Sequence, residues 1–141
     1  MADPHSLQRF VDAQSPVYPQ VLAELRAGRK TSHWMWFVFP QIEGLGASPM
    51  AQKFALASLD EARAFLAHPV LGPRLEECTL LLLEVPDRSI SEILGYPDDM
   101  KLRSSMTLFM RAAKPGSVFE DTLRRFFNNE PDARTLQKLG A

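Results

Sequence analysis

Helix-capping residues recur along this chain at short intervals, and they limit its possible folds more than any other feature of the sequence. Ser58-Leu59-Asp60-Glu61 and Ser89-Ile90-Ser91-Glu92 both have the capping-box pattern, in which a serine oxygen and a glutamate carboxylate each accept a hydrogen bond from a free backbone N–H. Alternating apolar and polar residues, which are typical of strands, are nearly absent. We therefore predict an all-α fold, a compact array of about seven short helices.

Apolar residues recur at helical spacing between these caps, and glycines and prolines end each segment before it becomes long. Gly28 and Gly95 are natural ends for two of the helices. We find no internal repeat and no low-complexity stretch, so we expect a single helical domain over residues 1–141. Helices are expected to begin at Ser6, near Pro19, at Ser58, near Pro73, and at Ser89, Pro97, Ser117 and Asp132.

The overall charge excludes some classes of partner. Sixteen basic and seventeen acidic residues leave a net charge of -1, which gives no general field for nucleic acid or an anionic membrane. Nucleic-acid binding is therefore disfavoured. No apolar stretch approaches the roughly 20 residues that a membrane span needs, and no signal-peptide pattern is present. We expect a cytoplasmic protein that does not enter the membrane.

Metal and cofactor motifs are also missing. Cys78 is the only cysteine and lies in an apolar run, so a buried, inert thiol is expected. The histidines His5, His33 and His68 share no metal-ligand spacing, and we predict no metal. The glycines of the chain match neither the dinucleotide fingerprint nor the phosphate-binding loop of nucleoside-triphosphate enzymes, and we predict no cofactor.

Both tryptophans, Trp34 and Trp36, lie in one aromatic segment between a basic loop and a glycine-rich loop. We expect residues 33–39 to form a short buried helix, since no partner strand is visible, with Phe37 and Phe39 in the core. The two indoles are either core residues or surfaces for stacking on a base or sugar ring. A buried indole would need an acceptor for its N–H group.

The flanks of this segment carry the residues most suited to binding an anion. Lys30 and Ser32 could bind one, and His33 is the best placed group for general acid or base catalysis. Ser48 is expected to cap a helix, which would leave free N–H groups near an anion, although an ordinary turn explains this loop as well. The other candidates for ligand binding here are Gln41, Gly44 and Gly46.

Two later stretches have a similar mixture of turns and polar groups. Arg74 lies in the first, between His68 and Leu75. In the second, Lys101, Ser104 and Ser105 fall at helical spacing, so that one face carries a cation beside two hydroxyl groups. Ordinary solvated surface explains this second pattern equally well.

A family resemblance rests on the run from Ser32 to Gln41, SHWMWFVFPQ, followed by Gly44-Leu45-Gly46 and Ser48. Here the sequence strongly resembles the domain-of-unknown-function family eighteen-ten, some of whose members carry a calpastatin label. The likeness continues through His68-Pro69, Leu71-Gly72 and Arg74-Leu75 to the stretch from Asp98 to Phe109, and so covers nearly the whole chain. It implies a small, mainly α-helical single domain and no established activity.

A weaker similarity is to the NADAR superfamily of N-glycosidases, which act on ADP-ribose conjugates. It rests on Gly72 with Arg74, on Met106, and on Phe126-Phe127. This resemblance implies recognition of an ADP-ribose-like ligand and cleavage of an N-glycosidic bond.

Two functions follow as hypotheses. In the first, residues 30–36 and 44–48 form a pocket for a nucleotide-like or ADP-ribose-like anion, with charge from Arg74 and Lys101. If that site is catalytic, we expect cleavage of an N-glycosidic bond, with His33 or Asp98 handling the proton. In the second, the domain is a non-enzymatic interaction module that uses exposed apolar surface, to which the six methionines could contribute.

Overall fold

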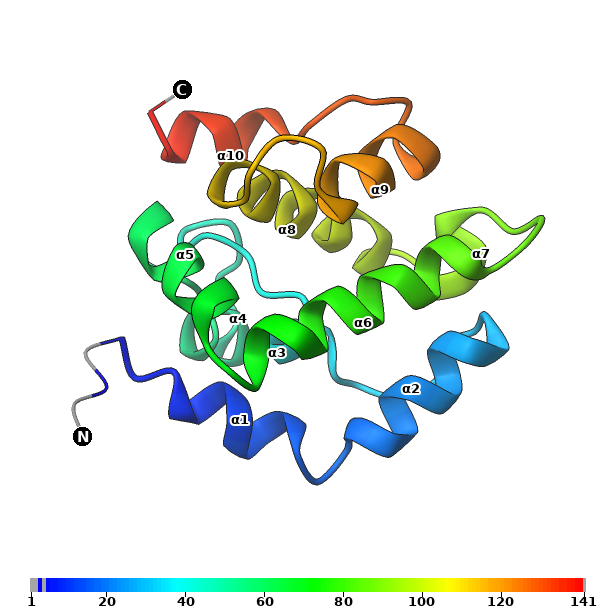
Figure 1. Cartoon of the computed structure of the whole chain (residues 1–141), viewed down its shortest axis with the longest axis horizontal. Coiled ribbons are helices and arrows are strands. Elements are labelled where there is room, and N and C mark those ends of the chain that lie inside the picture. Colours follow the sequence, from blue (N-terminus) through cyan, green and yellow to red (C-terminus); the bar gives the residue numbers. More distant parts are fainter. Residues whose placement is uncertain (1–2, 4, 141) are drawn as a thin grey trace.

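The computed structural model describes residue 3 and residues 5–140 of the chain. This part of the chain forms ten helices, joined by loops and turns, and no strand (Figure 1). The all-α prediction is confirmed, but about seven helices was too few, because the short segments predicted over residues 33–39, after Ser48 and after Ser89 each form a separate helix of four or five residues. The helices are α1 (Gln8–Gln14), α2 (Tyr18–Ala27), α3 (Met35–Val38), α4 (Pro49–Lys53), α5 (Leu59–Ala67), α6 (Leu71–Glu84), α7 (Ile90–Leu94), α8 (Asp98–Ala112), α9 (Val118–Phe126) and α10 (Ala133–Lys138).

Local capping explains where many of these helices begin. The side chains of Ser48, Ser58, Ser89, Ser117 and Asp132 each accept a hydrogen bond from the backbone N–H three residues later. Within the described part of the chain, the full capping box forms only at Ser89. At Ser58 the predicted second half of the box does not form, and the Glu61 carboxylate instead pairs with Arg9 at 3.3 Å.

The first helix differs from the prediction in its cap. Ser6 was expected to cap it, but Ser6 has a left-handed backbone conformation with φ 52° and its side chain accepts no bond from α1. Asp3 takes that role, because its two carboxylate oxygens accept hydrogen bonds from the N–H groups of Leu7 and Gln8, both at 2.9 Å.

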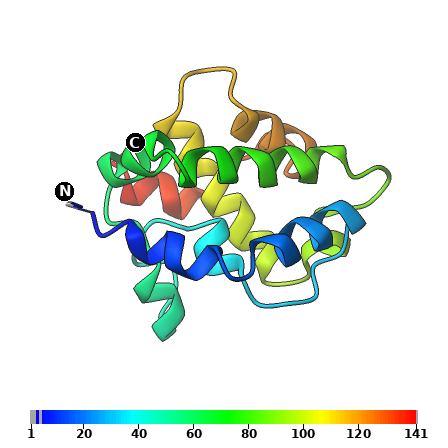
Figure 2. The ribbon, with the colours of Figure 1, turned by 60° about the horizontal axis from the view of Figure 1, so that its bottom comes forward.

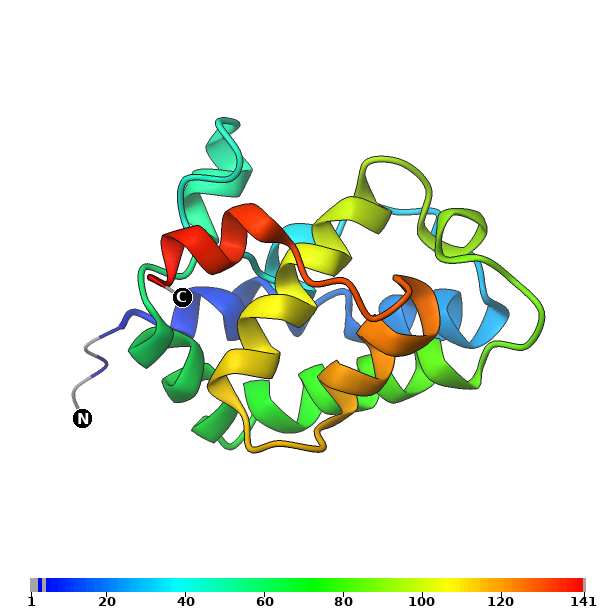
Figure 3. The ribbon, with the colours of Figure 1, turned by 90° about the horizontal axis from the view of Figure 1, so that it is seen from above.

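The two longest helices, α6 and α8, form the frame of the molecule. Helix α8 (yellow) crosses the middle with α9 and α10 beside it (Figure 3), and it also packs against α5 and α7. Helix α6 packs against α2, α3, α5 and α9, and α1 covers α3 (Figures 1 and 2). None of the helices in the described residues has the length and apolar character that a membrane crossing requires.

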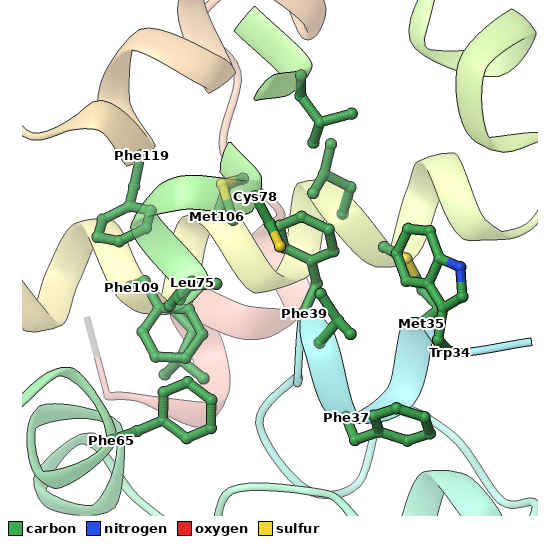
Figure 4. Close-up of a cluster of buried hydrophobic side chains, with 14 of the residues drawn as sticks. Trp34, Met35, Phe37, Phe39, Phe65, Leu75, Cys78, Met106, Phe109 and Phe119 are labelled. Atoms are coloured by element: carbon green, nitrogen blue, oxygen red, sulfur yellow. The ribbon is translucent and has the colours of Figure 1, made fainter. Parts of the chain in front are cut away.

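A chain of six phenylalanine rings runs through the core and joins helices that are distant in sequence. Neighbouring ring centroids lie 5.1–5.7 Å apart, in tilted or edge-to-face pairs that each contribute about 0.5–1.5 kcal/mol beyond burial. Four of these rings are labelled in Figure 4, beside Leu75, Cys78 and Met106. The rings follow the order Phe37, Phe54, Phe10, Phe65, Phe109 and Phe119.

Two sequence predictions about this core are confirmed. Phe37 and Phe39 are buried. Cys78 is a buried free thiol, and burial raises its pKa to about 12, so it stays protonated and inert at neutral pH.

Gly72 sets the contact between α5 and α6. A Cβ at this position would lie 2.1 Å from the carbonyl oxygen of Leu66, which is backbone and cannot turn aside. Glycine is therefore the residue that lets the first turn of α6 approach the end of α5.

We predict that Gly72→Ala destabilises the protein by about 1–3 kcal/mol or more, because the added methyl group overlaps a backbone oxygen. In an unobstructed helix the same change stabilises by about 0.8–1.0 kcal/mol, so the sign distinguishes the two situations. Urea unfolding monitored by circular dichroism measures the effect. A variant as stable as the wild type would contradict the close approach.

Candidate functional site

The carboxylate of Glu24, near the end of α2, accepts several hydrogen bonds from the loop that leads into α3. One oxygen accepts hydrogen bonds from the N–H groups of Thr31 at 2.8 Å and Ser32 at 3.0 Å, and from the Trp34 indole at 3.0 Å. The other accepts from the Ser32 hydroxyl at 2.6 Å and from the Gln20 amide at 2.9 Å. The buried indole thus has the acceptor that its N–H group requires.

These bonds fix the protonation of Glu24. Burial by itself raises the pKa of this carboxyl group, but the hydrogen bonds from Ser32, Thr31 and Gln20 outweigh burial and hold the pKa far below its usual range. Glu24 is therefore a structural anion at neutral pH. Its partners are committed to it, so neither the Ser32 hydroxyl nor the Trp34 ring, which is 1% exposed, is free to contact a ligand as predicted.

Beside this loop lies an ion cluster of Lys30, Asp98 and Lys101, which we call the lysine–aspartate cluster. The Lys30 ammonium lies 2.7 Å from one oxygen of Asp98, and the Lys101 ammonium lies 3.6 Å from the other. Each ammonium also faces an indole ring, Lys30 at 5.1 Å from Trp34 and Lys101 at 5.0 Å from Trp36. Two cations therefore share one carboxylate.

The two lysines have different surroundings. The Lys30 side chain is only 7% exposed, and its backbone N–H donates to the carbonyl of Ile93 at 2.7 Å, so it is the fixed partner of Asp98. The Lys101 side chain is more exposed and its ion pair is longer. The surplus positive charge of the cluster thus lies at Lys101, on the side that faces solvent.

Lys101 also lines a cleft of about 520 Å³, which we call the cation cleft. Three segments form its walls: the loop before α4 with the start of that helix, the first half of α8 with the turn before it, and the start of α10. Its lining residues are Gln41, Leu45, Gly46, Ala47, Ser48, Ala51, Tyr96, Pro97, Met100, Lys101, Ser104, Asp132 and Arg134.

The cleft brings together five of the residues predicted to bind a ligand: Gln41, Gly46, Ser48, Lys101 and Ser104. They come from two segments far apart in the sequence, which supports the idea that those segments meet. The Ser48 oxygen is used in capping α4, at 3.1 Å from the N–H of Ala51. The Ser104 hydroxyl donates to the carbonyl of Met100 at 3.3 Å and can still accept a bond.

A second cavity lies on the other side of the same loop. It measures about 430 Å³, and Gly44 and Gly46 line it together with Lys138 of α10. Gly46 belongs to both cavities, so the loop is their common wall. Gly44, predicted as a ligand-binding residue, therefore faces this second cavity.

Arg74 does not reach the cleft, contrary to the prediction. Its guanidinium donates to the Gln14 side chain at 3.4 Å and to the Ser15 hydroxyl at 3.2 Å, and it lies over the Tyr18 ring at 4.7 Å. Its position on α6 directs the side chain toward α1 and α2. Arg74 therefore holds these helices together and adds no charge to the cleft.

The two predicted catalytic residues are also separate from the cleft wall. His33 is exposed, and neither His33 nor Asp98 is among the residues that line it. Both oxygens of Asp98 face lysine ammonium groups. Across residues 3 and 5–140, no three His, Cys, Asp or Glu side chains gather closely enough to hold a metal ion.

Ser105, another predicted contact, is fully buried behind the cleft face of α8. Among the described residues its hydroxyl is the one buried side-chain polar atom without a hydrogen-bond partner. Ser105 thus lies one residue from the cleft wall without reaching it.

Sequence reasoning missed Tyr96, Met100 and Arg134. Tyr96 is 85% exposed and Met100 is 44% exposed, which is unusual for large apolar side chains, and both line the cleft. Tyr96 lies between Gly95 and Pro97 in a turn, outside any apolar helical pattern. The sequence did contain one indication of this site, because Tyr96 is an aromatic residue that does not belong to the apolar face of any predicted helix.

Comparison with known proteins places this chain in a family. The family model described as "Protein of unknown function (DUF1810)" matches residues 4–139, and the chain belongs to that family. The chain is similar to the conserved hypothetical protein Rv1873 from Mycobacterium tuberculosis, whose crystal structure has a TM-score of 0.97 to it. The two are 55% identical, over 99% of each chain. No curated protein matches. These comparisons do not show the NADAR N-glycosidase likeness.

We predict that Glu24→Gln lowers the free energy of unfolding at pH 7 by roughly 1.5–3 kcal/mol, because an amide replaces an ionised acceptor among buried donors. The folded state lowers the pKa of Glu24, so its stabilisation is present above the unfolded value of about 4.3 and is lost as pH falls toward the folded value. The gap between wild type and variant should therefore shrink below about pH 4.

Urea unfolding at a series of pH values measures that gap. Glu43→Gln is the matched control, because Glu43 is exposed and should leave stability unchanged at every pH. A gap that does not change with pH would contradict the role given to the carboxylate.

Proposed function

We propose that this protein binds a small nucleotide-like anion in the cation cleft. The observation that carries the proposal is the meeting, in one cleft of about 520 Å³, of two cationic side chains, Lys101 and Arg134, with an exposed aromatic ring, Tyr96. The size lies within the range of about 300–1,000 Å³ that is typical of small-molecule sites.

The charge balance favours an anion. Asp98 is matched by Lys30, so the charge of Lys101 is not cancelled within the lysine–aspartate cluster. Asp132, the acidic residue in the cleft wall, uses one carboxylate oxygen to cap α10, accepting from the N–H and hydroxyl of Thr135 at 2.9 and 2.6 Å. Lys101 and Arg134 against Asp132 leave a net positive cleft, which suits a phosphate or carboxylate.

The exposed side chains at the cleft favour a ligand with a planar ring. Tyr96 and Met100 offer a ring face and a polarizable thioether, both of which make good contacts with aromatic rings. Gln41 and Ser104 could hydrogen-bond to ribose hydroxyls or to the edge of a base. Nucleoside monophosphates and ADP-ribose combine these chemical groups.

The proposal extends to binding and not to bond cleavage. Cleavage of an N-glycosidic bond by His33 or Asp98 stays a prediction from sequence, since His33 does not line the cleft and Asp98 is held by two lysines. The protein-interaction alternative involves a different surface, on the outer side of α6.

We predict that AMP or ADP-ribose binds the wild type and that Lys101→Met weakens binding about tenfold or more, since a hydrogen bond to a charged group contributes roughly 1.5–3 kcal/mol. Isothermal titration calorimetry measures the Kd. Arg124→Met, at an exposed cation of α9 outside the cleft, is the matched control. The proposal fails if no member of a panel of AMP, ADP, ADP-ribose and inorganic phosphate binds, or if both variants bind like the wild type.

A second prediction separates the ring from the anion. Tyr96→Ala should weaken AMP binding about fivefold or more, because stacking on an aromatic side chain contributes roughly 1–3 kcal/mol per base. Binding of ribose 5-phosphate, which has no base, should be unchanged by the same substitution. Equal losses for both ligands, measured by calorimetry, would remove Tyr96 from the role of ring platform.

A further inference from the structure

Three shallow hollows follow one another across the outer side of α6, and none of their lining residues borders the cation cleft. The first, about 390 Å³, lies between α6 and residues 113–119. The second, about 380 Å³, lies over the helix itself, and the third, about 320 Å³, reaches residues 26–28 and 85–88. Glu76 and Leu80 link the first two hollows, and Leu81 and Glu84 link the last two.

The centre of this surface is apolar. Leu80 is 49% exposed. It lies on a helix that packs against four other helices, so its side chain is on the one side of α6 that no helix of the described residues covers. Single exposed leucines are common and need no explanation. Here Leu80 lies beside the half-buried Leu81 and the exposed Pro73 in one continuous hollowed surface.

Carboxylates surround Leu80 along the helix. Glu76 and Glu77 lie one turn before it and Glu84 one turn after it, and all three are exposed. We call this surface, formed by Pro73, Glu76, Glu77, Leu80, Leu81 and Glu84, the α6 face.

These carboxylates have no cationic partner within the described part of the chain. None of the three takes part in an ion pair there, and Glu77 accepts only the neutral hydroxyl of Tyr18, at 2.5 Å. Arg74, the one basic residue of α6, is turned toward α1 and α2. Elsewhere on the surface, Asp60 and Asp121 each pair with an arginine three residues later.

We propose that the α6 face is a docking surface for a basic amphipathic helix of a partner protein. Such a helix would place one apolar side chain against Leu80 and Leu81, with Lys or Arg one turn before and after it to meet the glutamates. The twelve residues from Pro73 to Glu84 span about 18 Å, which corresponds to about three turns of a docked helix. Lys114 lines the first hollow, and Arg26 and Arg88 line the third, so acidic or neutral residues are favoured at the two ends of the docked helix.

Charge complementarity argues for this occupant over others. Anionic lipid headgroups and nucleic acid would be repelled by three unpaired carboxylates. A second copy of this chain has a short helix with adjacent arginines, α9, but Arg124 pairs with Asp121 and Arg125 donates to the carbonyls of Leu83 and Val85. Both arginines are therefore already engaged.

The probe is a fluorescein-labelled helical peptide of fourteen residues, with leucines on one face and lysines flanking them, and its twin has glutamate in place of each lysine. Fluorescence anisotropy with the full-length protein should show binding of the lysine peptide in the micromolar range, weaker at high salt, and none of the glutamate peptide. Leu80→Ser should weaken binding about tenfold, as should the double variant Glu76→Gln with Glu84→Gln.

Matched controls test whether the surface is specific. Met100→Ser removes another exposed apolar side chain and Glu43→Gln another exposed carboxylate, and both should bind the lysine peptide like the wild type. Amide NMR shifts on peptide addition should fall on α6 and on residues 113–119, 26–28 and 85–88, which line the same hollows. Binding of both peptides, equal losses in the controls, or shifts elsewhere would overturn the proposal.

The same experiments distinguish a second copy and keep the two proposals apart. If sedimentation shows a dimer that Leu80→Ser converts to monomer, the occupant is this chain itself and the partner-helix proposal is overturned. AMP binding should be unchanged in Leu80→Ser, because no residue of the α6 face lines the cation cleft. Failure of one proposal therefore leaves the other standing.

Discussion

The buried carboxylate of Glu24 determines how the most unusual part of the sequence folds. A negative charge inside a protein is costly unless donors surround it, and here four groups from Thr31, Ser32 and Trp34 converge on it. They pull the loop after α2 onto the body of the molecule and place Trp34 in the core. Because Trp34 directly precedes α3, these hydrogen bonds also fix where α3 begins.

From this point a line of contacts leads to the cleft. Trp34 lies under the ammonium of Lys30, Lys30 is fixed to Asp98, and Asp98 shares its second oxygen with Lys101 in the cleft wall. The side chains of Trp34 and Lys30 are buried, and the ion pair between Lys30 and Asp98 is short. Lys101 is partly exposed, and its ion pair with Asp98 is longer. Rigid support behind an adjustable side chain is the arrangement that binding sites generally need.

The sequence predicted the features whose cause is local. A cap depends on a side chain and a backbone N–H three residues away, so Ser48, Ser58, Ser89, Ser117 and Asp132 could be assigned from the printed residues alone. The same holds for the helix spacing that put Lys101 and Ser104 on one face. The prediction at Ser6 failed because Ser6 has a left-handed backbone conformation, and Asp3 accepts the hydrogen bonds from the first N–H groups of the helix.

Features that depend on tertiary contacts could not be predicted in this way. Nothing near Glu24 in the sequence distinguishes it from an exposed helical glutamate, and its role appears only when the loop folds back. Arg74 and Lys101 both looked like free cations, yet one faces α1 and α2 while the other faces the cleft. The exposed ring of Tyr96 can be assigned to a binding site only because Arg134, nearly forty residues later in the sequence, lines the same cleft.

The loop that contains Gly44 and Gly46 separates two hollows and belongs to both. A displacement of this loop would change the shape of both hollows at once. A molecule that displaced the loop on binding in one hollow would therefore alter binding in the other, and thermodynamic reciprocity makes the two influences equal in size.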